Sequence, residues 1–239
     1  MDGEKQMKYI LMSGSFKTNE IPNEIISFLE RNIKKINSIS FVTSTFNNYK
    51  KNDYYVEKMI NSFEEKNIKF QNTYIIDSRL NEAEMKNNIN SSDIVFILGG
   101  NTLKQMEYIN KYNLKNVINN EKHILIGVSA GAINMAKKVV LAKDISDNIP
   151  NLSIYEGIGV SDYNIEPHCD FNDNIHFKDL IEASFYTNLI VMNENCFIII
   201  NDKNRKIYGD YFYLKKGNIY YKKKKCNLDY FLEEIKNYE

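Results

Sequence analysis

The sequence predicts an α/β protein in which a mostly parallel central sheet is flanked by helices in three layers. Short apolar runs alternate with longer amphipathic segments, which is the pattern of parallel strands joined by crossover helices. The runs are apolar along most of their length, as strands covered on both faces are. With 43% hydrophobic residues, 26% charged residues and only 3 prolines in 239 residues, the composition suits one globular domain over residues 1–239.

The first part of the chain supplies the parallel strands and most of the helices. We expect strands at Lys8–Met12, Ile39–Thr43, Lys69–Ile75, Asp93–Leu98 and His123–Val128. Between these runs, apolar residues recur at the spacing of one helix face. This periodicity predicts helices at Asn23–Ile36, Asp53–Asn67, Asn81–Ile89, Thr102–Asn110 and Ala130–Val140.

The last third of the chain predicts an antiparallel extension. Turn-forming residues at Asn201–Asn204 and Lys216–Asn218 separate short apolar segments there. We also expect a final helix at Leu228–Tyr238, and we interpret the basic run Lys222–Lys225 as a solvated face or a blunted edge strand. The short segments predict strands at Ser153–Val160, Leu189–Met192, Cys196–Asn201, Lys206–Tyr208 and Asn218–Tyr221.

Charge and cysteine usage argue against several classes of protein. The 31 basic and 31 acidic residues cancel, so the basic surface of a general nucleic-acid binder is not expected. The 3 cysteines have neither disulfide-framework nor zinc-ligand spacing, which favours a reducing compartment. The first apolar run, Tyr9–Met12, is too short for a signal sequence or a membrane span. We therefore expect a cytoplasmic protein that binds neither nucleic acid nor membrane and requires no metal or organic cofactor.

The most informative segment lies where the strand His123–Val128 meets a helix. It reads Gly127-Val-Ser129-Ala-Gly131, a Gly-x-Ser-x-Gly turn in the strand-turn-helix context of a nucleophile elbow. A nucleophile at such a turn has a strained backbone, so its neighbours must be small, as they are here. We predict that Ser129 is a nucleophile and that the following helix directs its N-terminal N–H groups toward an anion beside it. A phosphate-binding turn and a packing turn are the alternatives.

A second apolar strand ends in Gly99-Gly100-Asn101 just before a helix. Parallel strands that end side by side share a crevice at their carboxyl ends, so this loop is expected opposite Ser129. The N–H groups of Gly100 and Ala130 would then form a two-donor oxyanion hole. Asn101, beside that loop, is the candidate to hydrogen-bond a substrate. The alternative is a glycine turn that serves packing only.

Among the 3 histidines, His168 is the candidate general base. It follows Pro167, which stiffens the approach, and it lies in a loop with acidic neighbours that suit a positioned proton acceptor. We interpret His123, at the start of a buried strand, and His176, in a predicted helix, as structural. Cys169 lies beside His168 but lacks the strand-turn-helix context, which disfavours a thiol nucleophile.

Together, Gly99–Thr102, Gly127–Ala132 and Pro167-His168 resemble the motifs of the peptidase E (aspartyl dipeptidase) family of serine peptidases, which includes cyanophycinase. Their order, spacing and strand contexts agree from the first strand to about Asn201. The resemblance implies the fold of class I glutamine amidotransferases, a flavodoxin-like arrangement. It also implies that Ser129 is the nucleophile, that His168 is the general base, and that the Gly-Gly loop and the residue after the serine form the oxyanion hole.

Two acids compete for the third position of the implied triad. Glu194, before a late strand, is similar to an acid of this family, and Asp144, in a predicted loop after the serine helix, is the rival. The acid has to hold the imidazole Nδ1–H and stabilise the imidazolium. A residue at a strand terminus is held more rigidly than a residue in a loop, so Glu194 is the first choice.

The sequence departs from the aspartyl-specific members of the family. They place an arginine after the histidine, whereas residues 169–193 contain no arginine, and Lys178 is the basic side chain there besides His176. A lysine is a point charge and not a bidentate clamp, which leaves the preferred substrate side chain open. We expect a serine-dependent dipeptidase that acts on small peptides as a monomer or homodimer. The alternatives are a cyanophycinase-like or isoaspartyl amide hydrolase and a non-catalytic protein on the same scaffold.

Overall fold

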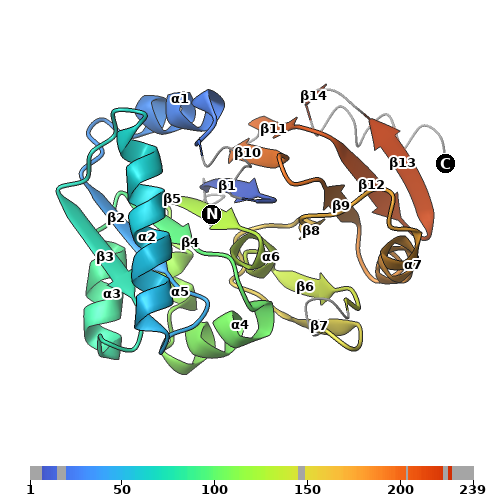
Figure 1. Ribbon diagram of the computed structural model, residues 1–239, viewed down its shortest axis with the longest axis horizontal. Coiled ribbons are helices and arrows are strands. Elements are labelled where there is room, and N and C mark those ends of the chain that lie inside the picture. Colours follow the sequence, from blue (N-terminus) through green and yellow to red (C-terminus); the bar gives the residue numbers. More distant parts are fainter. Residues whose placement is uncertain (1–6, 15–19, 145–148, 203, 223–225, 228–239) are drawn as a thin grey trace, which may run out of the picture.

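The computed structural model describes residues 7–14, 20–144, 149–202, 204–222 and 226–227, and a large mixed sheet forms its centre (Figure 1). This sheet contains β1 (Lys8–Met12), β2 (Ser38–Val42), β3 (Asn72–Ile76), β4 (Ile94–Ile97), β5 (Ile124–Val128), β10 (Phe197–Asn201), β11 (Asn204–Tyr208) and β14 (Cys226–Asn227). Their spatial order is β14-β11-β10-β1-β5-β4-β2-β3. From β3 to β1 the neighbours are parallel, and β10, β11 and β14 continue the sheet antiparallel. The predicted mostly parallel sheet with an antiparallel extension is therefore confirmed.

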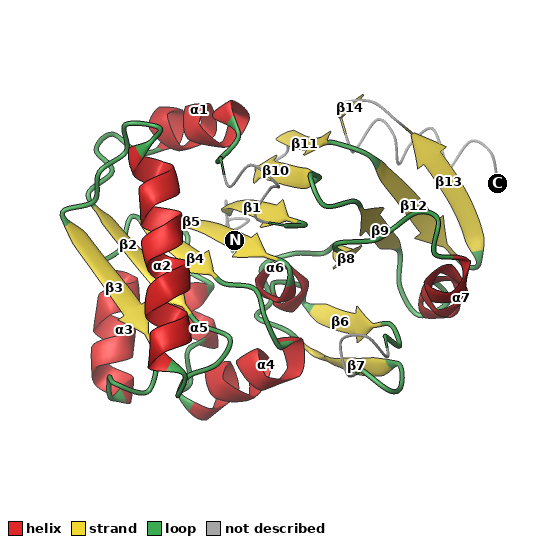
Figure 2. Cartoon of the chain, viewed as in Figure 1, coloured by secondary structure: helices red, strands yellow, loops and turns green. Residues whose placement is uncertain are grey.

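Helices cover both faces of the large sheet (Figure 2). One face packs against α1 (Asn23–Asn32) and α2 (Tyr49–Glu64), and the other against α3 (Glu82–Asn90), α4 (Thr102–Lys111), α5 (Lys115–Ile118) and α6 (Ala130–Asn134). Successive strand residues point to opposite faces. Ile10 therefore packs on the face covered by α1 and α2, and Leu11 packs on the face covered by α3 to α6. This double burial explains why the strands read as continuous apolar runs.

A smaller sheet lies beside the large one. Its strands β8 (Asn164–Glu166), β9 (Leu189–Met192), β12 (Tyr211–Lys215) and β13 (Asn218–Lys222) have the order β13-β12-β9-β8, and β6 (Lys138–Leu141) pairs separately with β7 (Ser153–Glu156). The helix α7 (Asn174–Ala183) buries Leu180 and Ala183 in one cluster with Leu214 of β12. Because β8 and β9 run parallel and side by side, the loops after them lie next to each other.

The predicted turns of the antiparallel segments are present. Asn201 pairs with Asn204 at the end of the β10–β11 hairpin, and Lys215 pairs with Asn218 at the end of the β12–β13 hairpin. In the second hairpin, Lys216 has φ 47° and Gly217 has φ 82°. Two positive φ values in a two-residue loop match the twist of the flanking strands, which is why a glycine is favoured there.

Some element bounds differ from the sequence prediction. The predicted helix Ala130–Val140 is a short helix, α6, followed by the strand β6, because Lys138–Leu141 pairs with Ser153–Glu156. A helix of 5 residues has a small dipole, so the predicted dipole contribution at Ser129 is overestimated. The helix predicted from Asp53 begins at Tyr49, where Asn48 caps it by accepting from Lys51 N–H. The strands β8, β12 and β14 and the helix α5 were not predicted.

The predicted final helix Leu228–Tyr238 and Lys223–Lys225 of the basic run lie outside the described residues. The single domain over residues 1–239 stays a prediction. None of the helices in the described ranges has the length and apolarity needed to cross a bilayer.

Candidate active site

Ser129 forms the turn between β5 and α6, at the carboxyl end of the parallel strands. Its backbone has φ 52° and ψ −119°, a sparsely populated conformation that costs a non-glycine residue about 1–3 kcal/mol. A Cβ added to Gly127 would lie 2.8 Å from Ala132 Cα, and one added to Gly131 would lie 2.2 Å from the Ile97 carbonyl oxygen. The small residues of the motif are therefore required by close packing. This is the local geometry of a nucleophile elbow.

The loop after β4 lies against Ser129. A Cβ added to Gly99 would come 3.2 Å from Ser129 Cβ, which leaves little space between the two segments. Gly100 has φ 133°, and a Cβ there would overlap Ser44 Oγ. Ala130 begins α6 directly after Ser129. Two neighbouring backbone N–H groups at this place are what an oxyanion hole from Gly100 and Ala130 requires.

His168 and Glu194 meet beyond the ends of β8 and β9. His168 follows Pro167 with φ 55°, and Glu194 lies in the turn between β9 and β10. The imidazole Nδ1 hydrogen-bonds Glu194 Oε2, while the two side chains stay 43% and 36% exposed. A carboxylate on Nδ1 fixes the ring tautomer and leaves Nε2 as the proton acceptor. The structure thus places Glu194 on the imidazole of His168, as the implied triad requires.

The end of β1 holds this pair in place, and sequence reasoning did not identify it. Ser13 is fully buried, and its Oγ accepts from the His168 backbone N–H at 2.8 Å and donates to the Met192 carbonyl oxygen at 3.4 Å. A Cβ on Gly14 would fall 2.0 Å from Glu194 Oε1, so only glycine leaves room for that carboxylate. The Ser-Gly dipeptide directly after a buried strand is the signal that could have indicated this role.

A buried network of polar side chains, Gln105, Asn134 and Tyr155, connects the glycine loop to the helix that follows Ser129. Gln105 of α4 donates to the Leu98 carbonyl oxygen at 2.7 Å, just before the glycine loop. Asn134 of α6 donates to Gln105 Oε1 at 3.1 Å and accepts from Tyr155 OH at 2.8 Å. Burial raises the pKa of the Tyr155 hydroxyl, which therefore stays a donor at neutral pH. The network fixes the glycine loop relative to the helix that begins after Ser129.

Two cavities open beside Ser129. The first, of about 230 Å³, lies toward α2 and is lined among others by Lys51, Lys58 and Tyr55. The second, of about 450 Å³, lies toward α7. Gly100, Ser129 and His168 line both of them. The structure therefore brings the predicted nucleophile, general base and oxyanion loop to one place.

Asp144, the rival acid, lies in the second cavity in a different group. One ligand atom each of Asp144, Glu166 and His176 lies within 4.8 Å of the others, a spacing that could hold a metal ion. However, His176 Nε2 already contacts Glu166 Oε1 at 3.3 Å. That hydrogen bond with Glu166 raises the pKa of His176, so two of the three groups are already bonded to each other. His176, interpreted as structural from the sequence, lies in the cavity next to Ser129.

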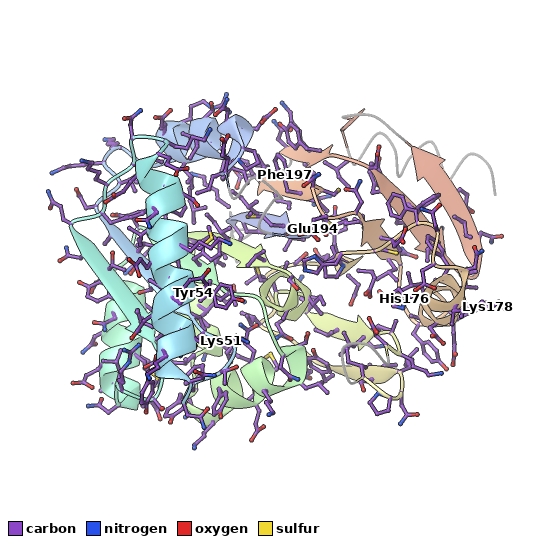
Figure 3. All side chains as sticks on the ribbon, viewed as in Figure 1. Lys51, Tyr54, His176, Lys178, Glu194 and Phe197 are labelled. Atoms are coloured by element: carbon purple, nitrogen blue, oxygen red, sulfur yellow. The ribbon has the colours of Figure 1, made fainter. Side chains whose placement is uncertain are left out.

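Asn101 and Lys178, two polar residues singled out in the sequence, do not line the cavities at Ser129. Asn101 caps α4, because its Oδ1 accepts from Lys104 N–H at 2.8 Å, and it lines neither of the two cavities at Ser129. Lys178 points away from the site on the far side of α7 (Figure 3).

Cys169 is buried, and burial together with nearby carboxylates raises the pKa of its thiol to about 12, which disfavours a thiolate at neutral pH. His123 is buried with Nε2 at 2.8 Å from the Ile118 carbonyl oxygen, in agreement with a structural role.

Comparisons with known proteins agree with this geometry. The model of peptidase family S51 matches residues 9–208. A peptidase structure from an acI-B1 Actinobacterium is similar with a TM-score of 0.68 and 13% identity over 95% of this chain and 98% of that chain. A candidate peptidase E protein from Listeria monocytogenes EGD-e is similar with a TM-score of 0.63 and 18% identity over 85% and 98% of the two chains. At these identities the likeness to the solved structures shows the fold. No curated protein matches the sequence significantly.

Proposed function

Because this chain belongs to peptidase family S51 and is a serine peptidase, we propose that it hydrolyses peptide bonds of dipeptides and other small peptides through an acyl-enzyme on Ser129. The single observation that carries the proposal is that His168, whose Nδ1 contacts Glu194, lines both of the cavities that Ser129 lines. The elbow conformation of Ser129 supports it, since a strained turn of this kind exposes the nucleophile.

The chemistry assigned to these residues is acyl transfer. Ser129 Oγ attacks the peptide carbonyl carbon while His168 Nε2 accepts the hydroxyl proton, and Glu194 stabilises the imidazolium. The N–H groups of Gly100 and Ala130 hold the resulting oxyanion. When the C–N bond breaks, His168 gives its proton to the leaving amine. Water then attacks the acyl-enzyme, with His168 again accepting the proton, and Ser129 is regenerated.

The size of the site supports a short substrate. The larger cavity, of about 450 Å³, is in the range of small-molecule sites, the smaller one, of about 230 Å³, is below it, and both are lined by Ser129. A peptide with one residue on each side of the cleaved bond would place its carbonyl carbon where the cavities join. This arrangement favours dipeptides over long chains.

A covalent probe tests the nucleophile directly. We expect a fluorophosphonate to add once to the native protein, at Ser129, because His168 activates that hydroxyl. Peptide mass spectrometry after digestion locates the adduct. The Ser153→Ala variant, which removes a serine of strand β7, should be labelled like the native protein, whereas Ser129→Ala should not. A native protein that stays unlabelled would support the non-catalytic alternative.

Ser13 is expected to act as a positioning residue for His168. Ser13→Ala removes the buried hydroxyl that accepts from the His168 backbone N–H, which costs about 1–3 kcal/mol of stability. The loop that holds the imidazole then loses its anchor, so kcat should fall by about tenfold or more while KM changes little. Steady-state kinetics and thermal unfolding measure both effects.

The matched control for Ser13 is Ser40→Ala, which removes another buried hydroxyl of the parallel sheet, bonded to Ser92 Oγ at 2.7 Å. It should lower stability without the same loss of kcat. Equal kcat losses in the two variants would mean that Ser13 contributes to stability alone.

A further inference from the structure

The two cavities at Ser129 carry opposite charge. The larger one is lined by five carboxylates, by Lys143 and by the imidazoles of His168 and His176; the carboxylates belong to Asp144, Glu166, Asp170, Asp173 and Asp179. The smaller one is lined by two lysines, Lys51 and Lys58, and by no carboxylate. In Figure 3, Lys51 on α2 and His176 on α7 are drawn to the left and to the right of Glu194. A molecule bound across Ser129 therefore meets a negative side and a positive side.

Three of the five carboxylates of the larger cavity accept hydrogen bonds from neighbouring groups. Glu166 accepts from His176 at 3.3 Å, and Asp173 accepts from the N–H groups of Ile175 and His176 at the start of α7. Asp170 accepts from the Asn172 backbone N–H at 3.0 Å. Groups held in this way need little reorganisation when a cation enters, which favours binding of a cation in the cavity.

The carboxylates of this cavity also act on the neighbouring Cys169 thiol. Besides burial, Glu166, Asp170, Asp173 and Asp144 all raise the pKa of the Cys169 thiol. The basic groups that line the cavity do not balance the carboxylates, since Lys143 and His176, the latter already hydrogen-bonded to Glu166, stand against five carboxylates, and Lys178 points away from the site. An acidic side chain would be repelled here, and a neutral one would leave the charges without a partner.

We propose that the larger cavity selects substrates whose amino-terminal residue carries a cationic side chain, lysine or arginine, and that the free carboxylate of the substrate lies in the cavity with Lys51 and Lys58. This inference rests on the proposed function, because it assigns the two sides of a peptide cleaved at Ser129. It is carried by the shared position of Ser129 between two cavities of opposite charge. A dipeptide has the matching polarity, positive at its amino end and negative at its carboxyl end.

A panel of dipeptides that differ in the first side chain tests the cationic preference. Lys-Leu and Arg-Leu should be cleaved with a kcat/KM at least about tenfold higher than Met-Leu, which has a similar length without the charge. Asp-Leu should be the poorest substrate. An equal or higher kcat/KM for Met-Leu or Asp-Leu would overturn the inference.

Charge-neutral variants locate the preference. Asp179→Asn should lower the ratio of kcat/KM for Lys-Leu over Met-Leu several-fold, because it removes one carboxylate of the larger cavity. Glu182→Gln, one turn further along the same helix and exposed outside both cavities, should leave that ratio within about twofold. Equal effects of the two variants would show that the net charge of the protein, and not the cavity, sets the preference.

The carboxylate side is tested with Lys-Leu against its C-terminal amide. The amide should be cleaved several-fold less efficiently, and equal cleavage would overturn the assignment of Lys51 and Lys58. Fluorophosphonate labelling distinguishes failure of the cationic preference from failure of the proposed peptidase activity. If Ser129 is labelled and Lys-Leu protects it no better than Asp-Leu, the inference fails while the proposed function holds. If no dipeptide is cleaved and Ser129 stays unlabelled, the proposed function fails and the inference with it.

Discussion

The Ser129→Ala variant is expected to hydrolyse the best dipeptide substrate with a kcat about 10³ to 10⁶ times lower than that of the native protein. The variant lacks the attacking oxygen, so no acyl-enzyme forms, and the remaining rate comes from binding and the oxyanion hole alone. Product amine released over time, measured by liquid chromatography, reports the turnover number. KM is expected to change little, because the cavity walls are unchanged.

The structure allows a clean comparison for this variant. Alanine keeps the Cβ that packs near Gly99, and serine and alanine meet the same backbone strain at φ 52°. Thermal unfolding should therefore coincide for the two proteins within about 1 kcal/mol. A variant that retains more than about a tenth of the native turnover would exclude Ser129 as the nucleophile.

Local features of the sequence were enough to predict the central sheet and the serine turn. The strand bounds Lys8–Met12 agree with the structure, and the other parallel strands differ by at most one residue at each end, except β3, which begins later than predicted, at Asn72. Because these strands are buried on both faces, they can be recognised in the sequence as apolar runs. The turn at Ser129 could be predicted because close packing requires small residues within a few positions of the serine.

Long-range packing explains what the sequence did not reveal. Ala136 and its neighbours continue a helical pattern, yet the pairing of β6 with β7 ends α6 at Asn134. Ser13 reaches His168 only because the end of β1 lies beside the loop after β8, 155 residues away along the chain. The acidic cavity likewise combines Asp144, Glu166 and Asp179 from three separate elements. No local pattern encodes such a combination.

The choice between Glu194 and Asp144 depends on long-range packing as well as on local sequence. Sequence reasoning kept two acids, because either one could stand near the histidine in a folded chain. The structure places the Glu194 carboxylate on His168 Nδ1 and gives Asp144 to the group with Glu166 and His176. The register of β8 against β9 decides this, since it sets the two following loops side by side.

Glu194→Gln is therefore expected to lower kcat by about two to four orders of magnitude. The amide keeps the size of the side chain but stabilises the imidazolium poorly, and it can hold the imidazole in the tautomer that protonates Nε2. The measurement is kcat for Met-Leu at saturating concentration, because a neutral peptide is least sensitive to the charge of the larger cavity.

Asp144→Asn is the matched control, since it makes the same carboxylate-to-amide change in the second cavity. Its kcat for Met-Leu should stay within about fivefold of the native value, while cleavage of Lys-Leu should weaken through a higher KM. The two variants thus separate a role at the imidazole from a role in binding. A large loss of kcat in Asp144→Asn with a near-native Glu194→Gln would assign the triad acid to Asp144, and it would require the loop that follows β6 to move toward His168 in the bound state.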